Sequence, residues 1–240
     1  MRRTYEINEL AKEESWRLFR IMGEFVDGFD ALSQFQPAVT IYGSARVKAD
    51  HPVYAQARDI GGKLARAGFS VFTGGGPGVM AAANQGANEE GGNSIGLFIR
   101  LNSQETPNPF TTLSLSFRYF FVRKVMLVRY ATAFVLMPGG LGTMDELFET
   151  LTLIQTQRIK PFPVILFGSR YWNGLLDWMR QDMMGDRFIK QKDLKQLVIT
   201  DDPSETVSVV ERWYHKGHRK APPSGTASLV TPVVATGRPL

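Results

Sequence analysis

Two glycine-rich segments have the composition of backbone turns that bind anions. They span residues 73–78 (TGGGPG) and 138–143 (PGGLGT), and each follows a short apolar run and precedes a segment with helical spacing. Glycine lets the chain turn sharply and lets an anion approach the N–H groups at a helix N-terminus. Because ligands of open parallel sheets bind beyond the carboxyl ends of the strands, the sequence predicts a phosphate site there.

The groups that we expect to bind the anion come from these two turns and from the end of the first strand. Ser44 ends that strand and offers a hydroxyl donor. Thr143 offers another hydroxyl and is placed to cap the following helix. The expected ligand-binding residues of these segments are Ser44, Gly75, Gly76, Gly139, Gly140, Gly142 and Thr143.

Three charged side chains are placed to act on a ligand held at the second turn. Glu146 follows the expected helix start by about one turn, where its carboxylate can point at the ligand and also complements the helix dipole. Arg123 and Lys124 lie in the apolar run of residues 120–127. A helix this apolar is buried over much of its surface, so its charges need partners.

The common nucleotide motifs match these turns poorly. Neither turn has the glycine-lysine-serine or glycine-lysine-threonine of a P-loop, and neither fits the strict G-x-G-x-x-G fingerprint. A looser form is met by Gly76, Gly78 and Ala81, but the next expected strand ends at Arg100, where an acid would bind the ribose of NAD. An arginine there suits a 2′-phosphate, so NADP stays open as an alternative.

Composition excludes several kinds of chemistry. The chain of 240 residues contains no cysteine, so disulfides and thiolate sites are excluded. Its three histidines, at 51, 215 and 218, form no convincing ligand set, and we expect neither a metal nor a cofactor. No apolar run approaches the roughly 20 residues that cross a bilayer, and residues 1–10 do not resemble a secretory signal. We therefore expect a cytoplasmic protein without a membrane partner.

The positive charge is concentrated in one short segment. The net charge is +5, and residues 215–240 supply four of these charges through Lys216, Arg219, Lys220 and Arg238, without any acid. The rest of the chain is close to neutral, so the segment is interpreted as a solvated tail and we expect no nucleic-acid partner.

Strand and helix patterns alternate along most of the chain. They predict an α/β fold with a Rossmann-like, mainly parallel sheet and helices on both faces. The division is an N-terminal helical extension (1–36), a nucleotide-binding catalytic domain (37–215) and a disordered tail (216–240). Strands are expected at 38–42, 69–73, 94–99, 133–137, 163–167 and, at an edge, 196–200. Helices are expected at 53–67, 79–90, 117–130, 142–157, 172–184 and 204–215, with a polar loop at 102–112.

The first 36 residues have a helical apolar stripe with further apolar side chains beside it. The stripe consists of Ile7, Leu10, Leu18, Ile21, Met22, Phe25 and Phe29, and the side chains beside it are Trp16, Phe19 and Val26. The helix either packs on its own domain or forms a subunit contact, and the pattern leaves both open.

The two turns and the charged residues together resemble the LOG (Lonely Guy) family. The similarity is carried by residues 74–80 (GGGPGVM), by Arg123 and Lys124, and by residues 138–146 (PGGLGTMDE), and it extends over about residues 37–200. LOG proteins are cytokinin riboside 5′-monophosphate phosphoribohydrolases, often labelled lysine decarboxylase-like. The resemblance implies a Rossmann-like fold, a homodimer or larger homo-oligomer, and release of a free base and ribose 5-phosphate. By motif position, Arg123 and Glu146 take the catalytic places.

These residues suggest a mechanism for cleaving the N-glycosidic bond of AMP or a cytokinin riboside monophosphate. The reaction passes through an oxocarbenium-like state, which the Glu146 carboxylate would stabilise while it orients a water. Arg123 would bind the ribose or phosphate or orient Glu146, and Lys124 is a weaker candidate for substrate contact. Two alternatives without catalysis remain: a carrier of nucleotide or molybdenum cofactor, and a nucleotide sensor whose loop at 102–112 responds to ligand.

Overall fold

A computed structural model describes residues 14–100 and 107–218 of the chain. The expected tail beyond residue 218, and the part of the N-terminal extension before residue 14, lie outside the described residues. Residues 102–106 of the expected loop at 102–112 also lie outside them.

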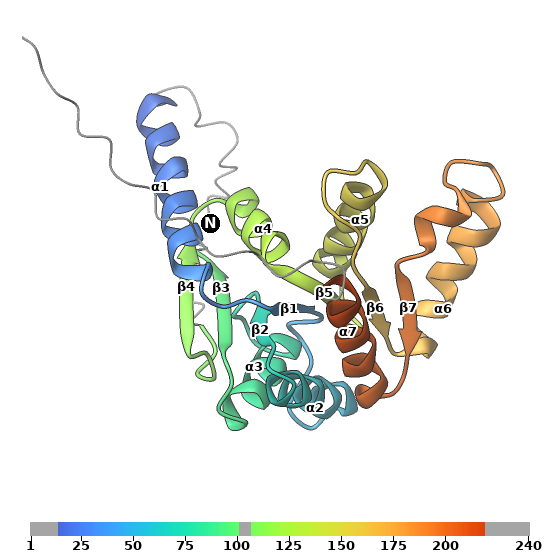
Figure 1. Cartoon of the computed structure of the whole chain (residues 1–240), viewed down its shortest axis with the longest axis horizontal. Coiled ribbons are helices and arrows are strands. Elements are labelled where there is room, and N and C mark those ends of the chain that lie inside the picture. Colours follow the sequence, from blue (N-terminus) through green and yellow to red (C-terminus); the bar gives the residue numbers. More distant parts are fainter. Residues whose placement is uncertain (1–13, 101–106, 219–240) are drawn as a thin grey trace, which may run out of the picture.

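The core of the protein is a seven-stranded sheet in which every pairing is parallel. The strand order is β4-β3-β2-β1-β5-β6-β7 (Figure 1). The strands are β1 (Ala38–Tyr42), β2 (Ser70–Thr73), β3 (Ser94–Ile99), β4 (Leu113–Phe117), β5 (Ala131–Leu136), β6 (Val164–Phe167) and β7 (Leu197–Thr200). This arrangement confirms the predicted α/β fold with a parallel sheet.

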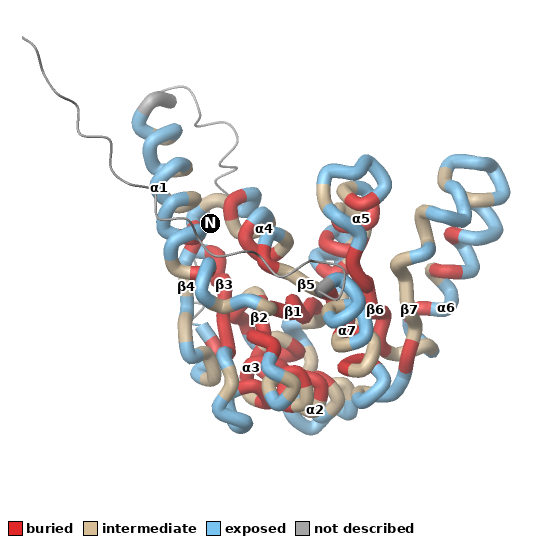
Figure 2. The backbone as a smooth tube through the Cα atoms, viewed as in Figure 1, coloured by how far each residue is buried: buried red, intermediate tan, exposed pale blue. Residues whose placement is uncertain are grey.

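Helices cover both faces of the sheet, which explains why its central strands are mainly apolar and buried throughout. Every residue of β1, β2, β3 and β6 is buried (Figure 2). One hydrophobic cluster joins the sheet to α2 (Pro52–Arg66), α3 (Val79–Glu89) and α7 (Pro203–His218). The other joins it to α1 (Glu14–Leu32), α4 (Phe120–Arg129), α5 (Leu141–Gln155) and α6 (Ser169–Trp178).

Strand β4 corrects the sequence-based assignment, which placed no strand between residues 99 and 133. Residues Leu113–Phe117 alternate leucine and serine and pair with β3 along its length. Their side chains alternate between partly buried and exposed, as expected of an edge strand with one solvated face. The helix expected from residue 117 therefore begins at Phe120 instead.

Further differences lie at the ends of helices. Helix α6 ends at Trp178, and a π-helical turn, Met179–Met183, completes the segment that was expected to be one helix. Helix α7 continues to His218, so the first three residues of the predicted tail are helical. Strand β7 lies at a sheet edge, as predicted. The division into three regions otherwise stays a prediction.

Helix α1 packs on its own domain through one side only. Ile21, Phe25 and Leu32 join the hydrophobic cluster on that face of the sheet. The Glu24 carboxylate accepts hydrogen bonds from the backbone N–H groups of Arg118 (2.9 Å) and Tyr119 (3.3 Å), just before α4. The rest of α1 is exposed along most of its length (Figure 2). In the described part of the chain, no helix is both long and apolar enough to span a bilayer.

Candidate active site

The carboxyl ends of the neighbouring strands β2, β1 and β5 open into one cavity of about 860 Å³. The loops that follow these strands form its floor, and α4 and α5 contribute side chains to its wall. Of the residues predicted to act on a ligand, Ser44, Arg123, Gly139, Gly140, Gly142, Thr143 and Glu146 all line this cavity. The crevice beyond the strand ends is where open parallel sheets bind ligands.

The three loops are tied to one another through backbone groups. The N–H of Ser44 donates to the carbonyl of Pro138 (3.1 Å), and the carbonyl of Ser44 accepts from the N–H of Val79 (3.0 Å). Gly78 has a φ of +69°, and a Cβ there would lie 2.3 Å from the Ser44 carbonyl oxygen. Position 78 therefore requires glycine, because this close approach fixes the first strand end against the start of α3.

The second glycine turn leads directly into α5, with Gly140 as its N-cap residue. No side chain caps this helix. The Thr143 N–H donates to the Gly140 carbonyl (3.0 Å), which leaves the N–H groups of Leu141 and Gly142 to meet an anion in the cavity. The prediction that Thr143 caps the helix is wrong, because Thr143 lies within the first turn, too far along to occupy the cap position. Its side chain is buried against Gly139, where an added Cβ would lie 2.0 Å from the Thr143 Oγ1.

The first glycine turn contributes less to the cavity than the sequence suggested. Gly74 lines it, whereas Gly75 and Gly76 are not among its lining residues. The Gly75 N–H donates to Thr73 Oγ1 (3.0 Å), and the carbonyls of Gly75 and Gly76 accept from the Asn108 side chain (3.0 and 3.1 Å). These hydrogen bonds hold the turn in shape, and ligand binding by Gly75 and Gly76 stays a prediction.

Asn108 is a structural residue of the site that the sequence reasoning missed. Its side chain is buried and also donates to Asn84 Oδ1 (3.0 Å), which accepts from Thr73 Oγ1 as well (2.6 Å). The only signal was its place in a polar loop, because the groups to which its side-chain amide donates lie 24 to 33 residues away in the sequence.

Glu146 is the ionisable group in the cavity whose environment is most unusual. It lies in the second turn of α5, and its residue is only 5% exposed. Burial raises the pKa of Glu146 to about 7, although the nearby Lys124 and Arg123 work in the opposite direction. A carboxyl with a pKa near 7 in a cleft is suited to general acid–base catalysis.

Arg123 faces the same cavity from α4. Its guanidinium lies over the Phe120 ring, 5.2 Å from the centroid. Burial lowers the pKa of Arg123, and the Glu146 carboxylate acts in the opposite direction. Both residues carry a buried atom without a hydrogen-bond partner within the described chain, Arg123 Nε and Glu146 Oε2. Unpaired buried polar atoms in a cleft indicate groups that a ligand completes.

Lys124 lies behind this pair and is not among the residues that line the cavity. Its Nζ is 2.6 Å from Asp145 Oδ2 and 2.9 Å from Glu149 Oε2. Burial alone would lower the pKa of Lys124, but these two acids raise it above its ordinary value. The structure therefore places Lys124 as a neighbour of Glu146, and direct contact with a substrate stays a prediction.

Two tyrosines of the site were not singled out from the sequence. Tyr42 is the last residue of β1, lines the cavity, and is 8% exposed. Tyr171, on α6, donates its hydroxyl to the carbonyl of Gly139 and so supports the second glycine turn. The position of Tyr42 at a strand end was a usable signal, whereas the contact between Tyr171 and Gly139 is not encoded in any local pattern.

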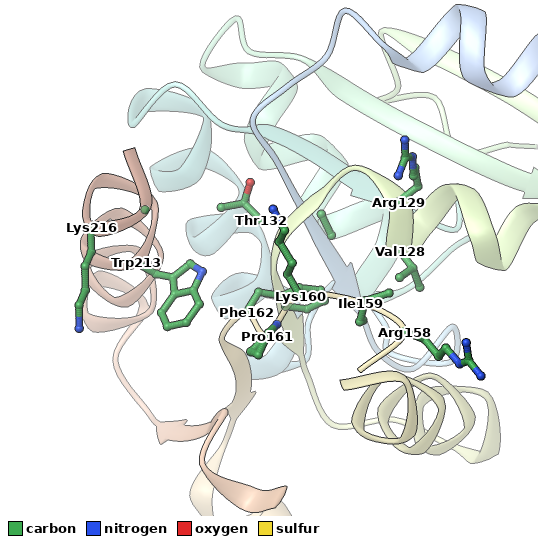
Figure 3. A pocket seen from close by; sticks show the side chains of 12 residues that line it. Val128, Arg129, Thr132, Arg158, Ile159, Lys160, Pro161, Phe162, Trp213 and Lys216 are labelled. Atoms are coloured by element: carbon green, nitrogen blue, oxygen red, sulfur yellow. The ribbon is translucent and has the colours of Figure 1, made fainter. Parts of the chain in front are cut away.

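A second cavity, of about 780 Å³, lies at the opposite side of the sheet near the start of β5 (Figure 3). Its four cations belong to segments at or just after helix ends: Arg129 to the last turn of α4, Lys216 to that of α7, and Arg158 and Lys160 to the loop after α5. Cations at these places offset the negative ends of helix dipoles. In Figure 3 the side chains of Arg129, Arg158 and Lys216 extend outward in different directions, and Lys160 alone runs toward Thr132, so the four cations do not converge.

Metal ligands do not gather in the described residues, where no group of three or more histidines or acids is placed to hold an ion. His51 lines the main cavity, and its Nδ1 accepts from the N–H of Val53 (3.1 Å) as the cap of α2. His51 therefore has a structural role as the N-cap of α2.

Known proteins resemble this chain in sequence over most of the segments that build the site. The family model described as "Possible lysine decarboxylase" matches residues 80–210. The cytokinin riboside 5′-monophosphate phosphoribohydrolase LOG5 of Arabidopsis thaliana is 29% identical over 145 residues, which are 60% of this chain and 63% of LOG5. The match thus spans less than two thirds of that relative.

Two solved structures share the fold. The X-ray structure of TM1055 matches with a TM-score of 0.59 and 25% identity, over 74% of this chain and 99% of that one. The molybdenum cofactor carrier protein of Chlamydomonas reinhardtii matches with a TM-score of 0.55 and 19% identity, over 75% and 98% of the two chains. With more than half of the sequence matched by the family model, this chain belongs to the LOG family, whose model is described as "Possible lysine decarboxylase".

Proposed function

We propose that this protein hydrolyses the N-glycosidic bond of a nucleoside 5′-monophosphate, such as AMP or a cytokinin riboside monophosphate, to a free base and ribose 5-phosphate. The observation that carries the proposal is the buried Glu146 carboxyl, with a pKa of about 7, in the same cavity as the uncapped start of α5. One feature suits acid–base chemistry and the other suits a phosphate. The phosphoribohydrolase name of LOG5 supports the same reaction.

The phosphate would bind at the second glycine turn. A Cβ added at Gly140 or Gly142 would meet nothing within 4 Å, so an anion can approach the backbone there closely. The dipole of α5 favours negative charge at this end. Binding energy from the phosphate, which does not react, would hold the sugar carbon near Glu146.

Glu146 would act on the sugar and on the attacking water. As a carboxylate it stabilises positive charge on the ribose ring while the C1′–N bond breaks and its electron pair leaves with the base. The water oxygen forms the new bond to C1′, and its proton passes to Glu146 before it reaches the departing base. Arg123 would bind the ribose or the phosphate through its guanidinium, whose Nε–H has no hydrogen-bond partner within the described chain.

Lys124 does not fit the Schiff-base lysine of a pyridoxal decarboxylase. A Schiff-base lysine must lose its proton to react, whereas Asp145 and Glu149 lie within 2.9 Å of Lys124 and stabilise its charge. The word "decarboxylase" in the family description is therefore not supported by this site.

The homodimer is the oligomeric state that we propose. Helix α1 exposes Trp16, Phe19, Met22 and Val26, and α4 exposes Phe120 and Phe121. Apolar side chains gathered on neighbouring elements mark surfaces that bind other proteins. A cytoplasmic location and the absence of a nucleic-acid partner stay predictions, which rest on the lack of cysteine and on the near-neutral body of the chain.

The direct test is a chromatographic screen of purified protein with a panel of nucleoside 5′-monophosphates. The proposed function predicts stoichiometric release of base and ribose 5-phosphate from at least one of them, and none from the corresponding nucleosides, which lack the phosphate. Tight binding of a monophosphate without release of any base would instead support the carrier or sensor alternative. The family name alone does not distinguish these outcomes.

A further inference from the structure

Three residues that line the cavity each carry an unpartnered polar atom, and only two of these residues have a role in the proposed reaction. Within the described chain, four buried side-chain atoms lack a hydrogen-bond partner: Tyr42 Oη, Arg123 Nε, Glu146 Oε2 and Gln196 Oε1. The first three belong to residues that line the main cavity. Leaving a buried polar group unpaired costs about 1–3 kcal/mol, so three in one place require a physical reason.

The fold holds the Tyr42 side chain in a fixed place. Tyr42 ends the central strand β1, and its ring packs edge-on against Phe134 with the centroids 5.1 Å apart. Its backbone carbonyl accepts from the N–H of Met137 (2.8 Å), at the end of the neighbouring β5. The hydroxyl of this cavity-lining residue is thus held in place by a rigid part of the sheet and by a ring that is almost fully buried.

The three groups differ in what they require of a partner. Arg123 Nε can only donate a hydrogen bond, and an ionised Glu146 can only accept one. The Tyr42 hydroxyl both donates and accepts, and it stays protonated because burial and the Glu146 carboxylate raise its pKa well above the ordinary value. A single ligand group that satisfies the set must therefore donate and accept.

A sugar hydroxyl donates and accepts through one atom, whereas the phosphate and the adenine base of AMP do not. A phosphate dianion offers only acceptors, so it cannot satisfy the Glu146 oxygen. The edge of adenine divides the two functions, since its amino group donates and its ring nitrogens accept. Neighbouring 2′- and 3′-hydroxyls offer two donors and several lone pairs, which is enough for a carboxylate, a guanidinium N–H and a phenol at the same time.

We propose that the Tyr42 hydroxyl, with Arg123 and Glu146, binds the 2′,3′-diol of the substrate ribose and makes the site selective for ribonucleotides over 2′-deoxyribonucleotides. The inference rests on the proposed function in that it places a nucleotide sugar in this cavity. A site whose buried polar groups pair with a substrate hydroxyl rejects the analogue that lacks it, because those groups are then left unpaired. Hydrogen bonds to a 2-hydroxyl also strengthen in oxocarbenium-like transition states.

The test compares AMP with 2′-deoxy-AMP in the wild type and in Tyr42→Phe, which removes the hydroxyl and keeps the ring. We expect the wild type to favour AMP in kcat/KM, and Tyr42→Phe to reduce this preference at least about tenfold, chiefly by slowing AMP. Tyr54→Phe is the matched control, since Tyr54 donates its hydroxyl to Gln85 Oε1 (2.9 Å) and does not line the cavity. That variant should keep the wild-type preference.

A purely structural role for the hydroxyl makes a different prediction. Because Tyr42 Oη has no partner within the described chain, Tyr42→Phe should melt at the wild-type temperature or above it, whereas loss of a structural hydrogen bond would lower the melting temperature. A lowered melting temperature, or an unchanged preference for AMP in a folded Tyr42→Phe that turns over substrate, overturns the inference and leaves the proposed function intact.

If the wild type releases no base from either nucleotide, the proposed function fails, and the inference is decided by calorimetric dissociation constants for the same two nucleotides. A wild-type preference for AMP that falls at least about tenfold in Tyr42→Phe then supports the inference without the reaction. Equal changes in affinity for AMP and deoxy-AMP overturn it, and so does failure of the wild type to bind either.

Discussion

Lys124 Nζ lies 3.9 Å from Glu146 Oε1, beyond hydrogen-bonding distance, although both side chains are largely buried. The lysine makes its short contacts with Asp145 and Glu149 instead. It therefore lowers the pKa of Glu146 through space without occupying the carboxylate, which leaves that group free to act on a ligand. This relation leads to a test by pH.

The proposed general base should appear in the pH dependence of the reaction. If the Glu146 carboxylate is the active form, kcat/KM falls as pH decreases through about 7, the pKa of that group. Lys124→Met removes a charge that lowers this pKa, so the acid limb should move to higher pH. The second ionisation of the substrate phosphate, near pH 6, is common to both proteins and cancels in the comparison. A limb that stays in place or moves to lower pH would show that Lys124 does not act on Glu146.

Glu146 should also make the protein less stable at alkaline pH. Its pKa in the folded state, about 7, is above the ordinary value of 4.5, so its favourable contribution is complete below pH 4.5 and is lost as pH rises through 7. Glu146→Gln resembles the protonated form. We expect this variant to exceed the wild type in free energy of unfolding by up to about 3 kcal/mol at pH 8 and to match it near pH 4.

Urea unfolding of both proteins at the two pH values measures this difference. Equal stability of variant and wild type at pH 8 would mean that the carboxyl is well solvated or well paired in the folded protein. Such a result would also remove the physical reason for its raised pKa.

The second glycine turn offers two substitutions with different expected effects. At Gly139 an added Cβ would lie 2.0 Å from Thr143 Oγ1 and 2.6 Å from Thr143 Cβ, whereas nothing lies within 4 Å at Gly140. Gly139→Ala should therefore destabilise the fold by roughly 1–3 kcal/mol. Gly140→Ala should keep the melting temperature but weaken the binding of AMP, because its methyl group projects where we expect the phosphate.

Melting curves and calorimetric titration with AMP separate the two effects. A Gly140→Ala variant that binds AMP as tightly as the wild type would place the phosphate elsewhere. If Gly139→Ala melts at the wild-type temperature, the prediction for this position is wrong, and the turn relaxes around the added methyl group without losing stability.

Much of the fold was predictable because it depends on local patterns. Short apolar runs that alternate with helical segments predicted six of the strands, and the glycine turns marked the ends of β2 and β5. Strand β4 was missed because its alternating leucines and serines cover only five residues next to a loop with two prolines.

The site was less predictable than the fold, since its properties arise from contacts between distant segments. The pKa of Glu146 depends on burial that the packed fold creates, and the amide of Asn108 reaches residues 32 and 33 positions earlier in the chain. Gly75 and Gly76 carry the glycine pattern of a binding loop, yet the structure turns them away from the cavity lining. Composition identifies a turn, but only the packed structure shows which of its faces meets the ligand.

The exposed side of α1 should hold two copies of the chain together. Phe19 and Val26 are 63% and 64% exposed, so replacing both with serine is expected to preserve the fold and to reduce the fraction of dimer at micromolar concentration. Light scattering coupled to gel filtration measures this fraction. Phe188→Ser, at a side chain that is 74% exposed in the loop after the π-helical turn Met179–Met183, is the control and should remain dimeric. A wild type that is monomeric would contradict the proposed homodimer.

The most direct test of the account separates binding from chemistry at Glu146. Glu146→Gln keeps the size of the side chain, so AMP should still bind at the glycine turn with an affinity within about tenfold of the wild type, while adenine release falls at least about a hundredfold. Glu211→Gln, on α7 away from the cavity lining, should retain both properties. Adenine release by folded Glu146→Gln at the wild-type rate would contradict the central claim that this carboxyl carries the reaction.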